Sequence, residues 1–217
     1  MKLRLKLVTI ILRNSRVLLF IPIIMVCCIL PLVSGFKYFY ANSSEARSIF
    51  IYLAQVLIPL CGLLWPMGYI HVWVEGDGCE ALRACTIHHK TCIGEVFLLS
   101  VGYLVMVIPI IIFAVFLFQI TWLEYVRLFL QYGIVIHFFY FTVMLLRNVT
   151  LGSIPIIAYL LFCFYISGSA DFASFSIIEP NYSAEFSRWS TLLALYFISL
   201  LFFLIGYLMD RYGRKYN

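Results

Sequence analysis

Six long apolar runs, almost free of charged residues, constrain this chain more than any other feature of its sequence. The runs cover about residues 17–36, 49–73, 93–120, 128–146, 151–169 and 189–209. A helix crosses a bilayer with about 20 apolar residues, so each run is long enough for one crossing. We therefore expect an all-α integral membrane protein with six transmembrane helices. The first run lacks a clear small-residue cleavage site, so we interpret it as a retained span and not as a signal peptide.

The overall composition excludes a water-soluble globule with an ordinary surface. Of the 217 residues, 64% are hydrophobic and 12% are charged, whereas soluble proteins carry about 25% charged residues. The net charge of +5 comes from cations at the ends of the apolar runs. No basic face with interleaved aromatic side chains occurs, so we predict no nucleic-acid partner.

Lysine and arginine gather in alternate connections, and this asymmetry predicts the orientation of the chain. With a cytoplasmic N-terminus, 11 of these side chains lie inside and 4 lie outside. The outside set is Lys37, Arg47, Arg127 and Arg188. The positive-inside rule then places both termini, including the tail 210–217, in the cytoplasm. We expect a multi-pass protein of a bacterial plasma membrane.

The apolar runs hold almost none of the ionisable groups that ion-coupled transporters need at membrane depth. Only His137 falls near the middle of a run, where it is either a hydrogen-bonded packing residue or a proton relay. The cysteines of loop 74–92 are spaced C-x5-C and C-x6-C, unlike the tight pairs of structural zinc sites. No P-loop or hydrolase motif occurs. We predict no catalytic residue, no metal and no cofactor in this chain.

The first of three polar segments is the stretch 1–16, which precedes the first span. Lys2, Lys6, Arg13 and Arg16 recur at helical spacing and share one face. A cationic amphipathic helix of this kind lies in the membrane interface, with its basic face toward anionic headgroups. We predict an interface helix that contacts membrane lipid; the alternative is a plain positive-inside anchor.

The second polar segment is the loop 74–92 between spans two and three, the longest predicted cytoplasmic connection. Its polar residues include Glu75, Asp77, Gly78, Glu80, Arg83, His88 and Lys90. An aspartate and a glycine suit a turn and a helix N-cap, and an acid in the first turn pairs with the arginine three residues later. The pattern predicts a short capped helix that serves as a docking handle; the alternative is a solvated helix without a partner.

The third polar segment is the outer connection 170–188 between spans five and six. Its aromatic and acidic residues include Phe172, Phe175, Glu179 and Phe186. Such a segment is too apolar for a free loop and too polar to span, which is typical of short helices that dip into the outer interface. It either closes the outer end of a pathway or forms an interfacial belt that anchors the fold.

These three segments occur in the same order in permease subunits of type-2 ABC transporters (ABC-2), which the chain resembles over nearly its whole length. The stretch VEGDGCEALR, from Val74 to Arg83, is similar to the E-G-x-x-E-x-L type pattern at the start of the corresponding loop in that family. The resemblance implies six spans with both termini cytoplasmic. It also implies a coupling helix in loop 74–92 and re-entrant helices in 170–188.

The resemblance also implies partners. The permease works with a second copy or a related permease, above separate ATPase subunits that bind ATP and Mg. Residues of loop 74–92, foremost Glu75, Glu80 and Arg83, are then the contacts to the ATPase, and spans one, two and five line the pathway. The substrate is an amphipathic or hydrophobic peptide, drug or lipid, and the short chain fits the compact permeases of peptide-antibiotic export or immunity.

Two other hypotheses remain open at the level of sequence. A membrane scaffold or assembly protein without transport activity also accounts for the missing intramembrane charges and the polar loop. An intramembrane enzyme would use His137 together with a cysteine, although no second catalytic group is evident beside it.

Overall fold

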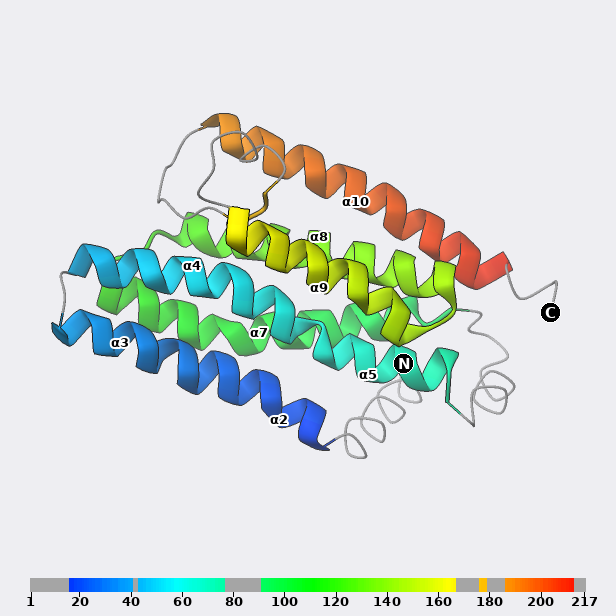
Figure 1. The fold of residues 1–217 in the computed structure, drawn as a ribbon, viewed down its shortest axis with the longest axis horizontal. Coiled ribbons are helices and arrows are strands. Elements are labelled where there is room, and N and C mark those ends of the chain that lie inside the picture. Colours follow the sequence, from blue (N-terminus) through cyan, green and yellow to red (C-terminus); the bar gives the residue numbers. More distant parts are fainter. Residues whose placement is uncertain (1–15, 41–42, 77–90, 167–175, 179–185, 213–217) are drawn as a thin grey trace.

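The computed structural model describes residues 16–40, 43–76, 91–166, 176–178 and 186–212. Helices make up nearly all of these ranges, and no strand occurs within them (Figure 1). In chain order they are α2 (Arg16–Ile24), the π-helical turn η1 (Met25–Ile29), α3 (Leu30–Tyr40), α4 (Ser43–Gly62), α5 (Leu64–Val74), α7 (Ile93–Phe118), α8 (Trp122–Leu146), α9 (Val149–Ile166) and α10 (Phe186–Tyr212). The predicted all-helical fold class is confirmed for these residues.

Four stretches of the described chain are helical, long and apolar enough to cross a membrane. They are Ala46–Val74, Ile93–Phe118, Trp122–Leu146 and Trp189–Tyr212. Two shorter apolar helices, Phe20–Gly35 and Val149–Tyr165, fall in the remaining two predicted spans. The expectation of a membrane protein is thereby supported, and four of its six predicted spans meet the requirement of length and hydropathy.

Helix α8 begins at Trp122, earlier than the start predicted at 128. The prediction placed Glu124 and Arg127 outside the span because both are charged. In the structure their side chains form an ion pair at 3.3 Å, one helical turn apart, and both are buried. The helix accommodates two charges at its start because they neutralise each other.

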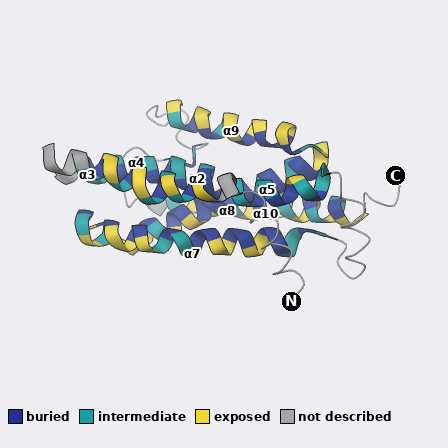
Figure 2. Cartoon of the chain, turned by 90° about the horizontal axis from the view of Figure 1, so that it is seen from below, coloured by how far each residue is buried: buried dark blue, intermediate teal, exposed yellow. Residues whose placement is uncertain are grey.

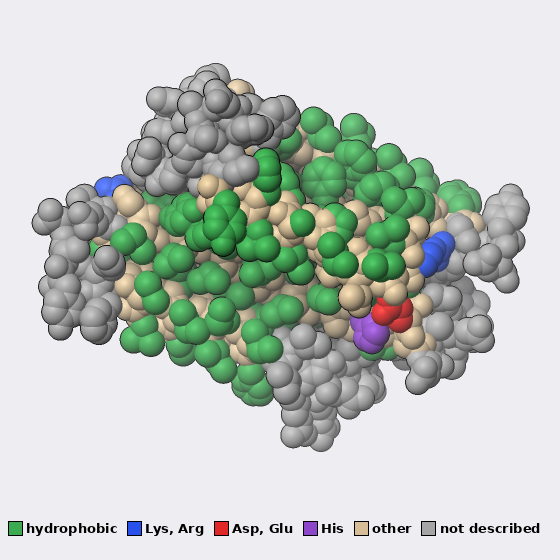
Figure 3. All heavy atoms as spheres, viewed as in Figure 1, with side chains coloured by type: hydrophobic (Ala, Val, Ile, Leu, Met, Phe, Trp, Pro, Cys, Tyr) green, Lys and Arg blue, Asp and Glu red, His purple; other side chains and the backbone are tan. Residues whose placement is uncertain are grey.

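Helix α8 lies at the centre of the bundle and contacts α4, α7, α9 and α10. Of its most apolar stretch, 67% is buried, against 17% for the corresponding stretch of α10, which packs mainly on α8. The outer faces of α7 and α9 are largely exposed (Figure 2). Apolar side chains cover most of the visible surface between the two ends of the bundle (Figure 3).

The interface between α8 and α10 combines aromatic side chains with glycines. The His137 ring lies 4.7 Å from that of Phe203, measured between centroids. A Cβ added at Gly133 would come within 2.5 Å of the Tyr196 ring, and one added at Gly206 within 3.1 Å of the Phe141 backbone. Small residues at such points let membrane helices approach closely, because dispersion contacts replace the hydrophobic effect in lipid.

The junction between α4 and α5 is a bend whose backbone carbonyls are bound by tyrosines. Pro66 has no N–H to donate to the Gly62 carbonyl four residues earlier. The Tyr132 hydroxyl donates to that carbonyl at 3.2 Å, and the Tyr103 hydroxyl donates to the Ile58 carbonyl at 2.8 Å. Tyr132 thus supplies the donor that Pro66 lacks, as bundles in lipid require, and Tyr103 adds a second hydrogen bond to the same bend.

Proline also accounts for the π-helical turn between α2 and α3. Pro31 cannot donate to the carbonyl four residues before it. The preceding residue, Leu30, instead donates its N–H to the Met25 carbonyl, five residues back. The extra residue in this turn lets the chain run helically from Arg16 to Tyr40 despite the proline.

A substitution at Gly62 tests the close packing at the α4–α5 bend. In Gly62→Ala the new Cβ would lie 2.4 Å from the Tyr132 ring and 2.6 Å from the Tyr103 ring, so both tyrosines must shift from the carbonyls that they bind. We expect a loss of about 1–3 kcal/mol in the free energy of unfolding. Thermal unfolding in detergent measures it.

Gly35→Ala is the matched control, because no atom lies within 4 Å of its added Cβ. This variant should be neutral or gain up to about 1 kcal/mol, since alanine favours a helix over glycine. Equal melting temperatures for the two variants would contradict the proposed packing.

Candidate functional site

Buried charges in the described part of the bundle lie near its two ends. At one end α2, α7 and α9 begin and α5, α8 and α10 end; we call it the Glu75 end. Glu95 and Asp210 are buried there. Glu124 and Arg127 are buried at the opposite end, the Glu124 end. The Glu75 end is the one from which the predicted coupling loop leaves the bundle.

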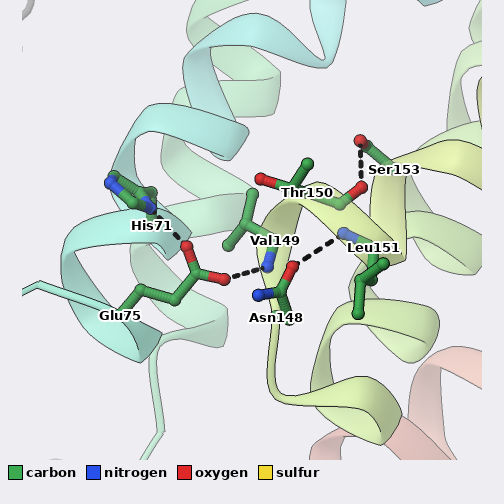
Figure 4. Close-up of polar contacts among 7 residues, drawn as sticks. All are labelled: His71, Glu75, Asn148, Val149, Thr150, Leu151 and Ser153. Carbon is green, nitrogen blue, oxygen red and sulfur yellow. Dashed lines mark hydrogen bonds and ion pairs between the residues drawn. The ribbon is translucent and has the colours of Figure 1, made fainter.

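Glu75 joins the end of α5 to the start of α9 (Figure 4). One carboxylate oxygen, Oε2, lies 2.7 Å from His71 Nδ1 on the same helix. The other, Oε1, accepts the backbone N–H of Val149 at 2.6 Å. The Glu75 side chain is 21% exposed. A residue that ends one helix therefore caps the first turn of another.

The start of α9 has a second cap, which comes from the residue directly before the helix. Arg147 ends α8 in the left-handed conformation, with φ 54° and its N–H on the Val143 carbonyl. Asn148 then accepts the Leu151 N–H on its side-chain oxygen at 2.7 Å. Asn148 and Glu75 thus satisfy two of the four N–H groups that a helix start leaves without partners, and the carboxylate also suits the positive end of the helix dipole.

Asp210 makes the corresponding junction at the start of α7. Its Oδ2 accepts the Cys92 backbone N–H at 3.0 Å and the Tyr140 hydroxyl at 3.1 Å. Asp210 is 1% exposed and lies near the end of α10, where the dipole of its own helix disfavours an acid. Its carboxylate faces instead the start of α7, where Cys92 offers no side-chain cap. One carboxylate therefore joins α7, α8 and α10.

These two junctions lie on either side of the connection between α5 and α7. The described chain leaves the bundle at Gly76, next to Glu75, and returns at Thr91, next to Cys92. Each end of the connection is therefore one residue away from a carboxylate junction.

Of the predicted coupling residues, the structure describes Glu75 and places it at this junction. The other predicted coupling residues lie outside the described ranges: Asp77, Gly78, Glu80, Arg83, His88 and Lys90. Sequence reasoning missed Asp210, which it assigned to the cytoplasmic tail. The signal available was an acid at the end of an otherwise apolar run, where it opposes the helix dipole.

The other predicted sites fall largely outside the described residues. For the interface helix these are Lys2, Lys6 and Arg13, and for the outer segment Phe172, Phe175 and Glu179. Arg16 begins α2 and Phe186 begins α10, and the structure describes the backbone of both without their side chains. The interface helix and the re-entrant helices stay predictions.

Part of the connection between α9 and α10 enters the bundle. Ile177 and Ile178 are buried, and the Ile177 carbonyl accepts a hydrogen bond from Gln131 Nε2. The same nitrogen lies 3.3 Å from Gln55 Oε1, and both glutamines are fully buried. Non-helical backbone at this depth needs such partners because lipid offers none. Sequence reasoning missed the two glutamines.

His137 is a packing residue with one hydrogen-bond partner in the described bundle. The Ser199 hydroxyl donates its single hydrogen to the Tyr196 carbonyl at 2.7 Å. It therefore accepts a hydrogen bond from His137 Nδ1 at 3.0 Å. Aromatic rings of α10 flank the imidazole, and no cluster of three metal-ligating side chains occurs among the described residues. This geometry favours the packing interpretation of His137 over the proton relay.

At the Glu124 end, the buried ion pair also contacts α10. The guanidinium of Arg127 lies over the Trp189 ring, 5.5 Å from its centroid, a favourable cation–π distance. A small pocket between α4, α7 and α8 is lined by apolar side chains and Glu124. It encloses about 10 Å³, the room of about one water molecule, which is too small for a transported substrate.

No family model, curated protein or solved structure matches the chain. Function is therefore inferred from the sequence and from the geometry of the two carboxylate junctions.

A substitution at Asp210 tests the junction as a structural element. Asp210→Ala removes the acceptor of both the Cys92 N–H and the Tyr140 hydroxyl. Hydrogen bonds to charged groups contribute about 1.5–3 kcal/mol each, so we expect the free energy of unfolding to fall by about 3 kcal/mol. Tyr140→Phe removes one of the two bonds and should lose about half as much. Thermal unfolding of both variants in detergent measures the effect, and equal stability of wild type and Asp210→Ala would contradict it.

Proposed function

We propose that this chain is the membrane-spanning permease subunit of a type-2 ATP-binding cassette transporter. In this proposal it crosses the plasma membrane six times with both termini in the cytoplasm. It moves an amphipathic or hydrophobic substrate, such as a peptide, drug or lipid, with energy from a separate ATPase subunit. The observation that carries the proposal is the pair of carboxylate junctions, Glu75 with Val149 and Asp210 with Cys92.

The junctions support an energy source outside the bundle. A force applied between Gly76 and Thr91 reaches α7 through the chain itself, the start of α9 through a hydrogen bond of 2.6 Å, and α10 through one of 3.0 Å. A flexible tether would not transmit such a force, whereas charge-assisted hydrogen bonds are short and directional. The connection is therefore suited to receive the movement of a partner that changes shape.

The middle of the described bundle supports the same conclusion by its chemistry. The buried polar side chains there include Gln55, Gln131 and His137, and none is an acid. Ion-coupled transport uses ionisable groups at membrane depth, and the buried acids of the described residues lie near the helix ends. An ATPase as the source of energy is consistent with this distribution.

The two shorter apolar helices are compatible with six crossings. Helix α9 has 18 residues, which at about 1.5 Å per residue gives about 27 Å, close to the hydrocarbon thickness of a bilayer. The first helical stretch runs from Arg16 through η1 to Tyr40. Each of the six helical segments then counts as one span in the proposal.

The pathway in this proposal lies between two permease chains, as the family resemblance implies. The pocket at the Glu124 end, of about 10 Å³, is too small to form part of it. Exposed apolar side chains on α2 and α9, such as Phe20, Leu161 and Tyr165, are available to lipid or to a second chain. We propose a second copy or a related permease as the partner in the membrane.

The decisive experiment is purification from native membranes with the associated ATPase, followed by ATP hydrolysis in proteoliposomes. Hydrolysis should require this chain. The double variant Glu80→Ala/Arg83→Ala should keep its melting temperature but uncouple hydrolysis from transport, because both side chains belong to the predicted coupling helix. Transport at the wild-type rate per ATP would contradict the assignment of the coupling loop.

A non-transporting scaffold or assembly protein is the second candidate, and the absence of a buried acid from the middle of the described bundle is equally compatible with it. The two functions differ in their partners. A scaffold should co-purify with a protein that hydrolyses no ATP, and Glu80→Ala/Arg83→Ala should then change assembly of that partner and no transport rate.

His137 distinguishes the permease from a proton-driven carrier or an intramembrane enzyme. His137→Phe keeps an aromatic ring between Tyr196 and Phe203 but removes both titratable nitrogens. We expect it to retain at least about half of the wild-type transport and to lose less than about 1.5 kcal/mol of stability, as volume-conserving core substitutions do. Transport assays and melting temperatures decide the matter. Loss of activity with unchanged stability would favour a chemical role for the imidazole.

A further inference from the structure

We infer that Glu75 and Asp210 are positioning residues that deliver movement of the α5–α7 connection to two different parts of the bundle. Glu75 delivers it to α9, and Asp210 delivers it to α8 and α10. Each acts by capping the first turn of a helix to which it does not belong. The inference rests on the proposed function, because it takes this connection as the place where the ATPase acts.

The route through Glu75 begins at the last turn of α5. The backbone N–H groups of Glu75 and Gly76 both bind the His71 carbonyl, at 2.8 and 3.0 Å, so the end of this helix is well defined. The Glu75 carboxylate bridges the His71 ring and the Val149 N–H (Figure 4). Rotation of the chain at this point therefore pulls on the first turn of α9.

The route through Asp210 begins at the other end of the connection. Cys92 is the last residue before α7, and its N–H is bound by Asp210 of α10. The same oxygen binds the Tyr140 hydroxyl of α8. A further bond runs from the Arg147 guanidinium, just after α8, to the Met209 carbonyl at 3.4 Å. Movement of Cys92 therefore acts on α7 and, through Asp210, on the central helix α8 together with α10.

The placement of Asp210 argues for more than packing. An acid in the last turns of a helix opposes the dipole of that helix, and a buried charge is costly unless it is bound. An apolar residue of similar size would avoid both costs at this position. The gain from the carboxylate lies at the start of α7, where it replaces a missing N-cap.

Hydrogen–deuterium exchange of the full chain in complex with its ATPase tests the two routes separately. Backbone exchange is followed at the first turn of α9 and the last turn of α8, without nucleotide and with ATP plus vanadate. In the wild type, nucleotide should change exchange at both turns. Glu75→Ala should remove the response at α9 and leave that at α8, and Asp210→Ala should do the reverse.

Without nucleotide, each alanine variant should also exchange about tenfold faster at its own helix start, because one charge-assisted hydrogen bond is lost. Glu75→Gln and Asp210→Asn keep an acceptor oxygen. They should therefore restore most of the response to nucleotide, which shows that the response depends on the hydrogen bond and not on the charge of the side chain. Glu124→Gln, a buried acid at the opposite end, is the matched control and should leave both responses intact.

The possible outcomes separate the two levels of the proposal. A wild-type complex that shows no nucleotide response at either turn overturns the proposed function, and this inference with it. A wild-type response that persists in full in Glu75→Ala overturns the inference alone. Should Asp210→Ala not fold, the Glu75 variants still decide, because that side chain is partly exposed and its replacement is less disruptive.

Discussion

The need to satisfy backbone polar groups without water organises this bundle. A group left without a partner in a lipid-exposed bundle costs several kcal/mol, and the described helices show how that cost is avoided. Tyr132 binds the Gly62 carbonyl that Pro66 leaves without a donor, and Gln131 binds the carbonyl of Ile177 where non-helical backbone enters the bundle. Side chains of one helix thus complete the backbone of another, which makes the helices interdependent.

The two carboxylate junctions apply the same principle at the helix starts. Glu75 and Asp210 each bind an N–H group at the beginning of a helix elsewhere in the chain. Both acids lie near the bundle end, so no charge is placed at mid-depth, and each still stabilises the first turn of a neighbouring helix. Both ends of the α5–α7 connection thus lie next to such a hydrogen bond, and the proposed transmission of movement rests on this arrangement.

The distribution of polarity along the bundle bears on its energy source. Buried charges of the described residues gather near the two ends, whereas the middle holds amides, hydroxyls and the packed His137. This distribution of the described residues is one of the observations that support the proposed ATPase as the source of energy.

Much of the architecture followed from the sequence alone, because hydropathy is a local property. The apolar runs predicted where the helices lie. The start of α8 was placed too late, because Glu124 and Arg127 neutralise each other only once they face each other on a helix. The Asp210 junction could not be predicted, since its hydrogen bond spans 118 residues of sequence. Sequence by itself determined that the chain is helical and apolar enough for a membrane; only the tertiary structure decided which acids cap which helices, because that depends on contacts between distant segments.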